Sequence, residues 1–429
     1  MATITVNFNR AVNTSLVACI FLVFWVVFKD ALKASLLFSI PDIGMVAFIA
    51  TAFISFFAFF QGFRSLKLTR FDVLLLIYIL YSSIVTSIHS LLHNPYALTP
   101  YQTVIIFSFQ CLTMLLLWLF STQSPAAFVA VTNFFTRLAL FGSVLFGAIL
   151  LAFVIVDLDV VFRFYKNLLE LGIIVNPFQT SDDGIAVRYS GLFNSALNFG
   201  MFVVFLTISL LCGDIKGPKK KVIFLILLLL LASSFNRNAL ITFAYVGVAI
   251  FLVRAGMKKN MVFPAMIFSL TFIALSLVFI VKLSSQIDQS NSFFLSANSL
   301  YSRFEIWSYW FSSLDIGSAL YGNGVIAGMG DEHVYVDNGY IFMIVNSGIF
   351  SLAFLLTCVF QLTLTAAKRK SQNSDFAFFL LLGLPVAMIF NNIVLDPMLM
   401  LLFFFYPIAL LKDEVSRVGK LKFAAGAIT

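Results

Sequence analysis

The sequence predicts an all-α integral membrane protein with about 12 transmembrane helices. Of its 429 residues, 61% are hydrophobic and only 11% are charged, which leaves too few polar groups to cover a soluble domain. The 53 Phe residues are spread through leucine-rich runs rather than along alternating polar and apolar faces. Lipid is therefore the expected solvent for most of the chain.

Apolar runs of about 17–25 residues, long enough to cross a bilayer as helices, recur along the whole chain. Because no Gly/Ser-rich or Pro-rich linker divides it, we treat residues 1–429 as a single polytopic membrane domain. The expected helices lie near residues 13–28, 43–61, 71–89, 101–120, 138–156, 192–212, 222–235, 238–254, 261–281, 339–360, 376–393 and 395–411.

The distribution of lysine and arginine between these helices predicts their orientation. Of the 27 Lys and Arg residues, 19 fall on one side of the expected membrane and 8 on the other. The positive-inside rule assigns the richer side, together with both termini, to the cytoplasm. This asymmetry also accounts for the net charge of +8, so no nucleic-acid partner is needed to explain it.

Two long polar segments, residues 157–191 and 282–338, fall on the extracytoplasmic side, and we expect them to form the active site. In the longer one, residues 299–317 carry apolar positions at helical spacing and include Trp307 and Trp310. This pattern predicts a helix lying at the outer interface, with both indoles in the aromatic belt.

The cysteines offer no framework for disulfides or metal binding. All four, Cys19, Cys111, Cys212 and Cys358, lie inside apolar runs without metal-ligand spacing. Packing against protein or lipid is the expected role of each.

Three arginines on the outer side are candidate anion ligands. Arg188 directly precedes an apolar run, Arg237 occupies a turn between two helices of about 16 residues, and Arg303 lies in the amphipathic stretch. A guanidinium stays charged and its planar fork matches phosphate oxygens, so three of them converging would suit a phosphate or pyrophosphate. Interface cations bound to lipid headgroups, or a local pair of Arg303 with Glu305, are the alternative explanation.

Candidate general bases lie in the long loop and just before the helix expected from residue 339. Asp337 is the first choice, His333 the second and Glu305 the next, because a carboxylate or imidazole beside a water-poor cavity can have its pKa tuned toward neutrality. Asn338 and Tyr340 are the adjacent polar groups that could orient a substrate. Asp337 and Asn338 are equally suited to cap the helix.

Four short pieces occur in a distinctive order between residues 188 and 350. Their order, spacing and sidedness resemble the O-antigen ligase and polymerase superfamily of bacterial inner-membrane proteins, especially the Wzy-type polymerases. The pieces are Arg188-Tyr189-Ser190-Gly191-Leu192-Phe193 with Asn198; Ser234-Phe235-Asn236-Arg237-Asn238-Ala239; Arg303 with Trp307 and Gly322-Asn323-Gly324; and Asp337-Asn338-Gly339-Tyr340-Ile341 with Asn346-Ser347-Gly348-Ile349. The second piece differs from the family pattern by what looks like an insertion before its arginine, Arg237.

The resemblance implies a GT-C-like, metal-independent and inverting glycosyltransferase that needs no cofactor. Its donor and acceptor would be glycans linked to undecaprenyl pyrophosphate at the periplasmic face of the cytoplasmic membrane. A chain-length regulator and a flippase of the same pathway would be its candidate protein partners. The three arginines would then stabilise the departing pyrophosphate, while a base accepts the proton of the acceptor hydroxyl.

One difference within the family bears on polymerase against ligase. Where the ligases carry His-Asn before the tyrosine, this chain carries Asp337-Asn338, with His333 four residues earlier. This favours a polymerase of repeat units over a ligase that transfers glycan to lipid A-core. A lipid-linked oligosaccharide flippase or other transporter is a further hypothesis, weakened because the sequence shows no repeated halves.

The charge pattern predicts the side on which individual residues lie. Cysteines introduced singly at Asp182 or His333 should react with a membrane-impermeant maleimide in intact cells. Those introduced at Lys220, Arg369 or Lys420 should react only after lysis, because their positions are cytoplasmic. Labelling of position 369 but not of 333 would overturn the orientation.

Overall fold

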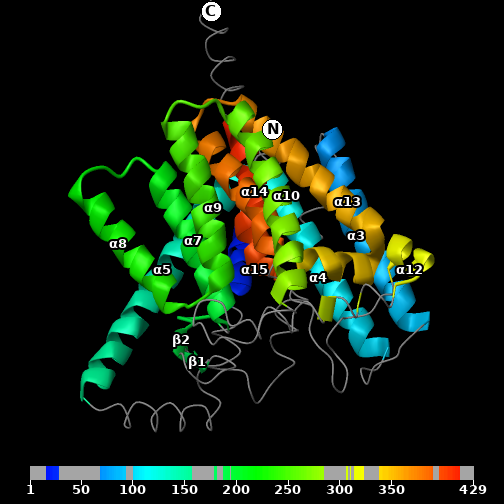
Figure 1. Ribbon diagram of the computed structural model, residues 1–429, viewed down its shortest axis with the longest axis horizontal. Coiled ribbons are helices and arrows are strands. Elements are labelled where there is room, and N and C mark those ends of the chain that lie inside the picture. The colour runs from blue at the N-terminus through cyan, green and yellow to red at the C-terminus, as the bar shows by residue number, and fades with distance from the viewer. Residues whose placement is uncertain are drawn as a thin grey trace, which may run out of the picture.

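The chain folds into a bundle of helices (Figure 1). The computed structural model describes residues 16–28, 68–92, 100–156, 178–180, 187–193, 195–284, 306–307, 310, 314–322, 338–389 and 396–415. The helices are Leu16–Phe28, α3 (Arg70–Leu92), α4 (Pro100–Gln123), α5 (Pro125–Val156), α7 (Ala196–Cys212), α8 (Pro218–Ser233), α9 (Arg237–Arg254), α10 (Lys259–Ser284), α12 (Ile316–Tyr321), α13 (Gly339–Lys368), α14 (Gln372–Ile389) and α15 (Pro397–Met400).

The described part supports the predicted α-helical membrane protein. Four of its helices are long and apolar enough to cross a membrane, namely α9, α13, α14 and residues Pro125–Ala148 of α5. Large apolar side chains, such as Phe141, Phe251 and Phe268, are exposed on the outside of the bundle, as expected where lipid surrounds a protein. Each predicted helix overlaps a described one except 43–61, which lies outside the described residues. The number of spans stays a prediction.

The predicted start of one helix is wrong. Instead of beginning at residue 138, α5 begins at Pro125 and runs for 32 residues, so Arg137 lies within the helix. Proline suits a first helical position because it lacks the N–H that would be unpaired there. Scattered polar residues between 121 and 137 concealed the helix from a search for apolar runs.

A small antiparallel ladder is an unpredicted exception to the helical fold. It joins β1 (Phe178–Thr180) to β2 (Val187–Tyr189) within the segment expected to form the first outer loop. The Tyr189 hydroxyl donates a hydrogen bond of 2.5 Å to the Ser143 carbonyl of α5. This contact fastens the ladder to the bundle just before α7.

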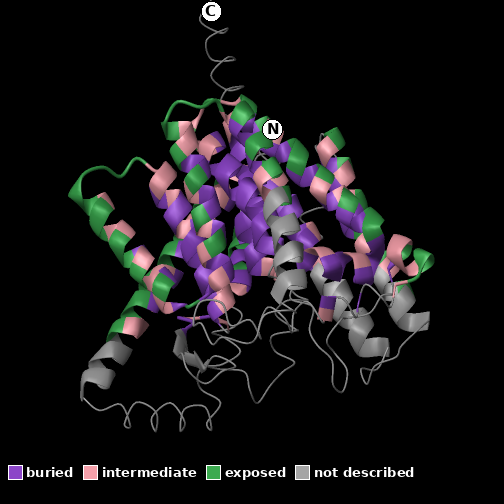
Figure 2. Cartoon of the chain, viewed as in Figure 1, coloured by how far each residue is buried: buried purple, intermediate pink, exposed green. Residues whose placement is uncertain are grey.

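Helix α14 lies at the centre of the bundle (Figure 2). Every residue from Phe376 to Ile389 is buried, and the helix packs against α7, α9, α13 and the last helical segment. A helix that is apolar all round is stable only when neighbours cover all its faces. The surrounding helices are therefore placed by their contacts with α14.

The last helical segment is buried from Met398 to Leu411. It starts as α15, continues through a π-helical stretch, η3 (Leu401–Phe405), and ends at residue 415. At its start Asp396 accepts a hydrogen bond from Asn198 at 2.6 Å, and near its end Lys412 pairs with buried Asp72 of α3 at 2.6 Å. The segment is thus held by one polar contact at its start and one near its end, with apolar residues between them.

Cations and carbonyls meet at one end of the bundle, which we call the basic end. Here α7, α9 and α13 finish, and α3, α8, α10 and α14 begin. Lys220 and Arg254 both donate to the Leu211 carbonyl in the last turn of α7, at 3.3 and 2.7 Å. Because the final carbonyls of a helix lack internal partners and carry partial negative charge, cations stabilise them.

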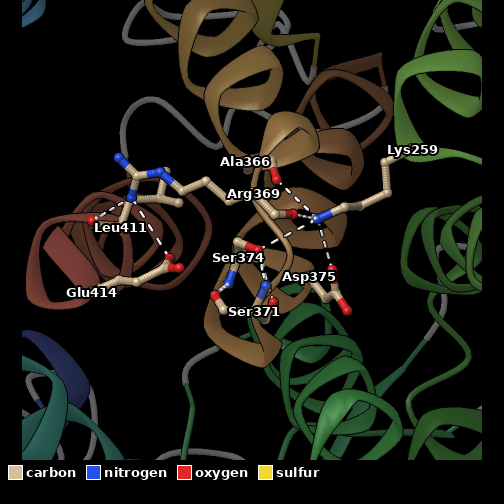
Figure 3. Close-up of polar contacts among 8 residues, drawn as sticks. All are labelled: Lys259, Ala366, Arg369, Ser371, Ser374, Asp375, Leu411 and Glu414. Atoms are coloured by element: carbon tan, nitrogen blue, oxygen red, sulfur yellow. Dashed lines mark hydrogen bonds and ion pairs between the residues drawn. The ribbon is translucent and has the colours of Figure 1, made fainter. Parts of the chain in front are cut away.

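Lys259 makes the most extensive of these contacts (Figure 3). Its ammonium group donates to the carbonyls of Ala366 and Arg369 at the end of α13, at 2.9 and 2.6 Å. It also pairs with Asp375 in the first turn of α14 at 2.7 Å, while its own side chain is only 9% exposed. One cation thus joins three helices at their ends.

Loss of this cation should weaken the bundle. Replacing Lys259 by Met keeps the apolar stem but leaves two carbonyls and a carboxylate without their donor, so the free energy of unfolding should fall by about 2 kcal/mol. Reversible unfolding of the purified protein in mixed micelles measures it. Lys258→Met at the exposed neighbouring position is the matched control. Equal losses in both variants would contradict the role of Lys259.

Candidate functional site

The other end of the bundle, which we call the cap end, gathers helix N-termini. Helices α7, α9, α13 and α15 begin there, and each is preceded by a polar residue whose side-chain oxygen accepts backbone N–H groups of the first turn. These N-cap residues are Ser195, Asn236, Asn338 and Asp396. Helix N-termini carry partial positive charge, which the Asp396 carboxylate offsets at α15 and the three neutral caps leave in place at α7, α9 and α13.

Asn236 joins two of these helices while capping one of them. Its Oδ1 accepts from the backbone N–H groups of Asn238 and Ala239 at 3.0 and 3.2 Å. Its Nδ2 donates to the Leu197 carbonyl in the first turn of α7 at 3.0 Å. A Cβ atom on Gly200 would lie 2.9 Å from the Ala239 Cβ and 3.0 Å from the Asn236 Cβ, so the small residue allows this close crossing.

Carbonyls near the end of α14 are bound by side chains from two neighbouring helices. Asn238 of α9 donates to the Ala387 carbonyl at 2.9 Å, and the Tyr340 hydroxyl of α13 donates to the Pro385 carbonyl at 2.8 Å. These two bonds therefore fix α9 and α13 against the central helix at the cap end.

Two buried polar atoms on α9 have no hydrogen-bond partner within the described part of the chain. They are the Oδ1 atom of Asn238 and the Oγ1 atom of Thr242, one helical turn deeper. The Asn238 amide orientation follows from its carbonyl partner, because only the NH₂ group can donate to Ala387. The network thus retains unused hydrogen-bonding capacity.

The contact between Asn198 and Asp396 was not predicted as part of the site. The Asp396 carboxylate accepts from Asn198 with one oxygen and caps α15 with the other, at 2.8 and 3.2 Å from the N–H groups of Met398 and Leu399. Asp followed by Pro before an apolar run is a signal for a helix start. The pairing with Asn198 could not be read from sequence, because 198 positions separate the two residues.

Two predicted arginines belong to segments at the cap end. Arg237 is the first residue of α9, partly exposed, and lies between Asn236 and Asn238 in the chain. Arg188 pairs by its backbone with Gln179 in the ladder, and β2 contacts α7 and α8. The fold therefore brings the Arg188 backbone and Arg237 to the same end of the bundle.

The other predicted site residues are only partly described. Asn338 caps α13, with its Oδ1 at 3.0 and 3.1 Å from the N–H groups of Tyr340 and Ile341. That contact is the capping alternative, while the substrate-orienting roles of Asn338 and Tyr340 stay predictions. Predicted residues outside the described part of the chain are Arg303, Glu305, His333 and Asp337.

The tryptophans of the long loop differ from expectation. Trp307 and Trp310 are 9% and 5% exposed and belong to the apolar core, so the interpretation of both as members of an exposed aromatic belt is wrong. Helical spacing correctly indicated helical backbone at these positions. An amphipathic stretch of sequence cannot show whether its apolar face meets lipid or protein.

The described residues contain no group of three or more His, Cys, Asp or Glu side chains that could hold a metal ion. No protein-family model matches the chain, and no match was found among curated proteins. The case for a function therefore depends on the residues of the cap end and on the resemblance of their sequence pieces.

The two roles of Asn236 can be separated by one substitution. Asp caps helices about as well as Asn, but Asn236→Asp replaces the donor facing the Leu197 carbonyl by an acceptor, which should cost about 2 kcal/mol of unfolding free energy at neutral pH. At acidic pH a protonated carboxyl can donate again, so the loss should shrink. Unfolding in micelles across pH measures both effects.

The control is Asn260→Asp, the same change at an exposed position on α10. A stability of Asn236→Asp equal to that of the wild-type protein at neutral pH would show that the contact with α7 contributes nothing.

Proposed function

We propose that this protein polymerises oligosaccharide repeat units carried on undecaprenyl pyrophosphate into a surface polysaccharide, at the outer face of a bacterial cytoplasmic membrane. The observation that carries the proposal is the meeting of three separate sequence pieces of the resemblance at the cap end. They begin at Arg188, at Ser234 and in the stretch that leads into α13. Asn236 links the second piece to the first helix turn after the first piece, and α14 lies between the second and third.

The chemistry of the cap end suits a lipid pyrophosphate. Arg237 and the N-termini of α7, α9 and α13, which are capped by neutral side chains, supply positive potential at this end of the bundle, and such potential would stabilise the charge that develops on a leaving pyrophosphate. The polyprenyl tail would run along the lipid-exposed apolar surfaces of the helices. The proposal therefore includes about 12 spans, with the cap end outside and the basic end in the cytoplasm.

The proposed reaction is a single displacement with inversion. A hydroxyl of the acceptor glycan forms a bond to C1 of the donor sugar while the bond from C1 to the pyrophosphate oxygen breaks. Arg188, Arg237 and Arg303 receive the undecaprenyl pyrophosphate anion, and the hydroxyl proton passes to Asp337 in our first assignment, with His333 and Glu305 as the alternatives. No metal or cofactor takes part in this scheme.

Glycan analysis of a strain that lacks the protein tests the proposal. Accumulation of single repeat units on the lipid carrier is expected, because transfer between carriers would stop. Full-length polymer stranded on its carrier would instead indicate the ligase, and repeat units trapped on the cytoplasmic side would indicate the flippase. Either of these results would overturn the proposal.

Complementation of the same strain tests the assigned base. Asp337→Asn should restore less than about 1% of the polymer made by wild-type protein, since Asn has the size of Asp but cannot accept a proton, while Asn338 still caps α13. The matched control is Asp315→Asn. Asp315 is an exposed N-cap whose Oδ1 accepts from Ser318 N at 2.6 Å, and it should complement fully. Normal polymer from Asp337→Asn would reject this assignment.

A further inference from the structure

Helix α5 carries an arginine in the middle of its apolar length. Arg137 is the single charged residue in the stretch Pro125–Ala148, the part of α5 that is long and apolar enough to cross a membrane. It lies about 18 Å along the helix axis from the first residue of this stretch and about 17 Å from the last. A charged side chain so far from both ends of a span is costly unless it has a partner.

The contacts of α5 also place Arg137 well inside the bundle. The helix starts directly after α4, and one turn before Arg137 the Asn133 side chain accepts a hydrogen bond from the Tyr406 hydroxyl at 2.8 Å. Tyr406 precedes Lys412 of the basic end by six residues in a helical segment, which is about 9 Å. Arg137 therefore lies a further helical turn away from the basic end.

Arg137 makes no hydrogen bond or ion pair with any residue that the structure describes, and its side chain is exposed. The Asn133 oxygen one turn away is bound by Tyr406. Every described carboxylate lies in the first or last turn of a helix, at an N-cap or in a connection between helices. The described bundle thus presents an unneutralised guanidinium on the outside of a span.

The arginine lies beside an outward-facing apolar stripe of α5. The stripe consists of Phe134, Leu138, Phe141 and Leu145, which are 62%, 44%, 66% and 49% exposed. Successive members are four, three and four residues apart, the spacing with which one helix packs along another. The opposite side of α5 is buried, as Phe128, Thr132 and Ala139 show. The stripe is therefore suited to contact a neighbouring helix.

The charge of Arg137 decides which neighbour fits. Arginines that bind lipid headgroups do so from positions near helix ends, whereas Arg137 is at the middle of its span. A carboxylate on another transmembrane helix can meet the guanidinium at its own depth and accept two parallel hydrogen bonds. A second copy of the described residues offers no carboxylate at the middle of a span. The required neighbour is a different membrane protein.

We propose that the outward face of α5 docks a transmembrane helix of a partner protein, whose Asp or Glu side chain near the middle of the membrane pairs with Arg137. The apolar stripe packs along the partner helix, and the ion pair fixes the register between the two helices. This surface is separate from the cap end, so the inference does not depend on the proposed polymerase function.

Photo-crosslinking of the full-length protein in the membranes of cells that make it tests the docking. A benzophenone amino acid replaces Phe141 on the stripe or, as the matched control, Phe268, which is 75% exposed on α10. We expect a discrete protein adduct from position 141 that position 268 does not give. Arg137→Leu should lower the yield of this adduct at least about tenfold, and Arg137→Lys, which keeps the charge, should lower it less.

Mass spectrometry of the adduct then tests the chemistry of the partner. The crosslinked segment should carry Asp or Glu within an apolar run of about 20 residues. Replacing that acid by its amide should reduce the yield as Arg137→Leu does. Arg137→Glu should abolish the adduct, and an arginine in place of the partner's acid should restore it, because the exchange re-forms the pair with its charges reversed.

The stability of the purified protein in micelles separates docking from a role of Arg137 within its own bundle. Arg137→Leu should resist unfolding at least as well as wild-type protein, because it removes a charge without a described partner. A less stable Arg137→Leu would overturn the proposal. So would an adduct yield independent of Arg137, adducts with lipid or a second copy of this chain alone, or a partner segment that lacks an acid.

Discussion

Backbone groups at helix ends must find partners where little water is available, and this requirement organises both ends of the bundle. At the basic end, lysines and arginines bind the carbonyls with which α7 and α13 finish. At the cap end, side-chain oxygens accept the N–H groups with which α7, α9, α13 and α15 begin. Several of these side chains also bind a second helix. The interactions that satisfy the backbone groups at the end of one helix therefore also position the helices beside it.

The two ends consequently differ in what they can bind. The basic end uses much of its cationic charge on its own carbonyls and on carboxylates such as Asp72 and Asp375. At the cap end the partial positive charges of the helices add to that of Arg237, and the apolar surroundings increase their effect. In the proposed function, an anionic headgroup attached to a long apolar tail would occupy this end.

Apolar periodicity predicted most of the helices because lipid and protein interior select the same residue types. It failed at α5, where polar residues occur along a helix that begins at Pro125. The candidate arginine Arg237 could be found because an unusual charge beside an apolar run is visible in the sequence. The pairing of Asn198 with Asp396 depends on how the helices pack against one another. The burial of Trp307 depends on whether protein or lipid covers its side chain. Neither is a local property of the chain.

The π-helical stretch Leu401–Phe405 fixes a helical phase. One residue more than an α-helix needs is accommodated between Asp396 and Lys412, whose partners lie on α7 and α3. Deleting any one residue of this stretch would leave its apolar composition almost unchanged and allow regular α-helix. Because the stretch absorbs the extra residue, such a deletion would leave Asp396 and Lys412 facing nearly the same directions, whereas a deletion in the regular helix on either side would rotate one relative to the other by about 100°. Single deletions should therefore be tolerated within this stretch but not beside it.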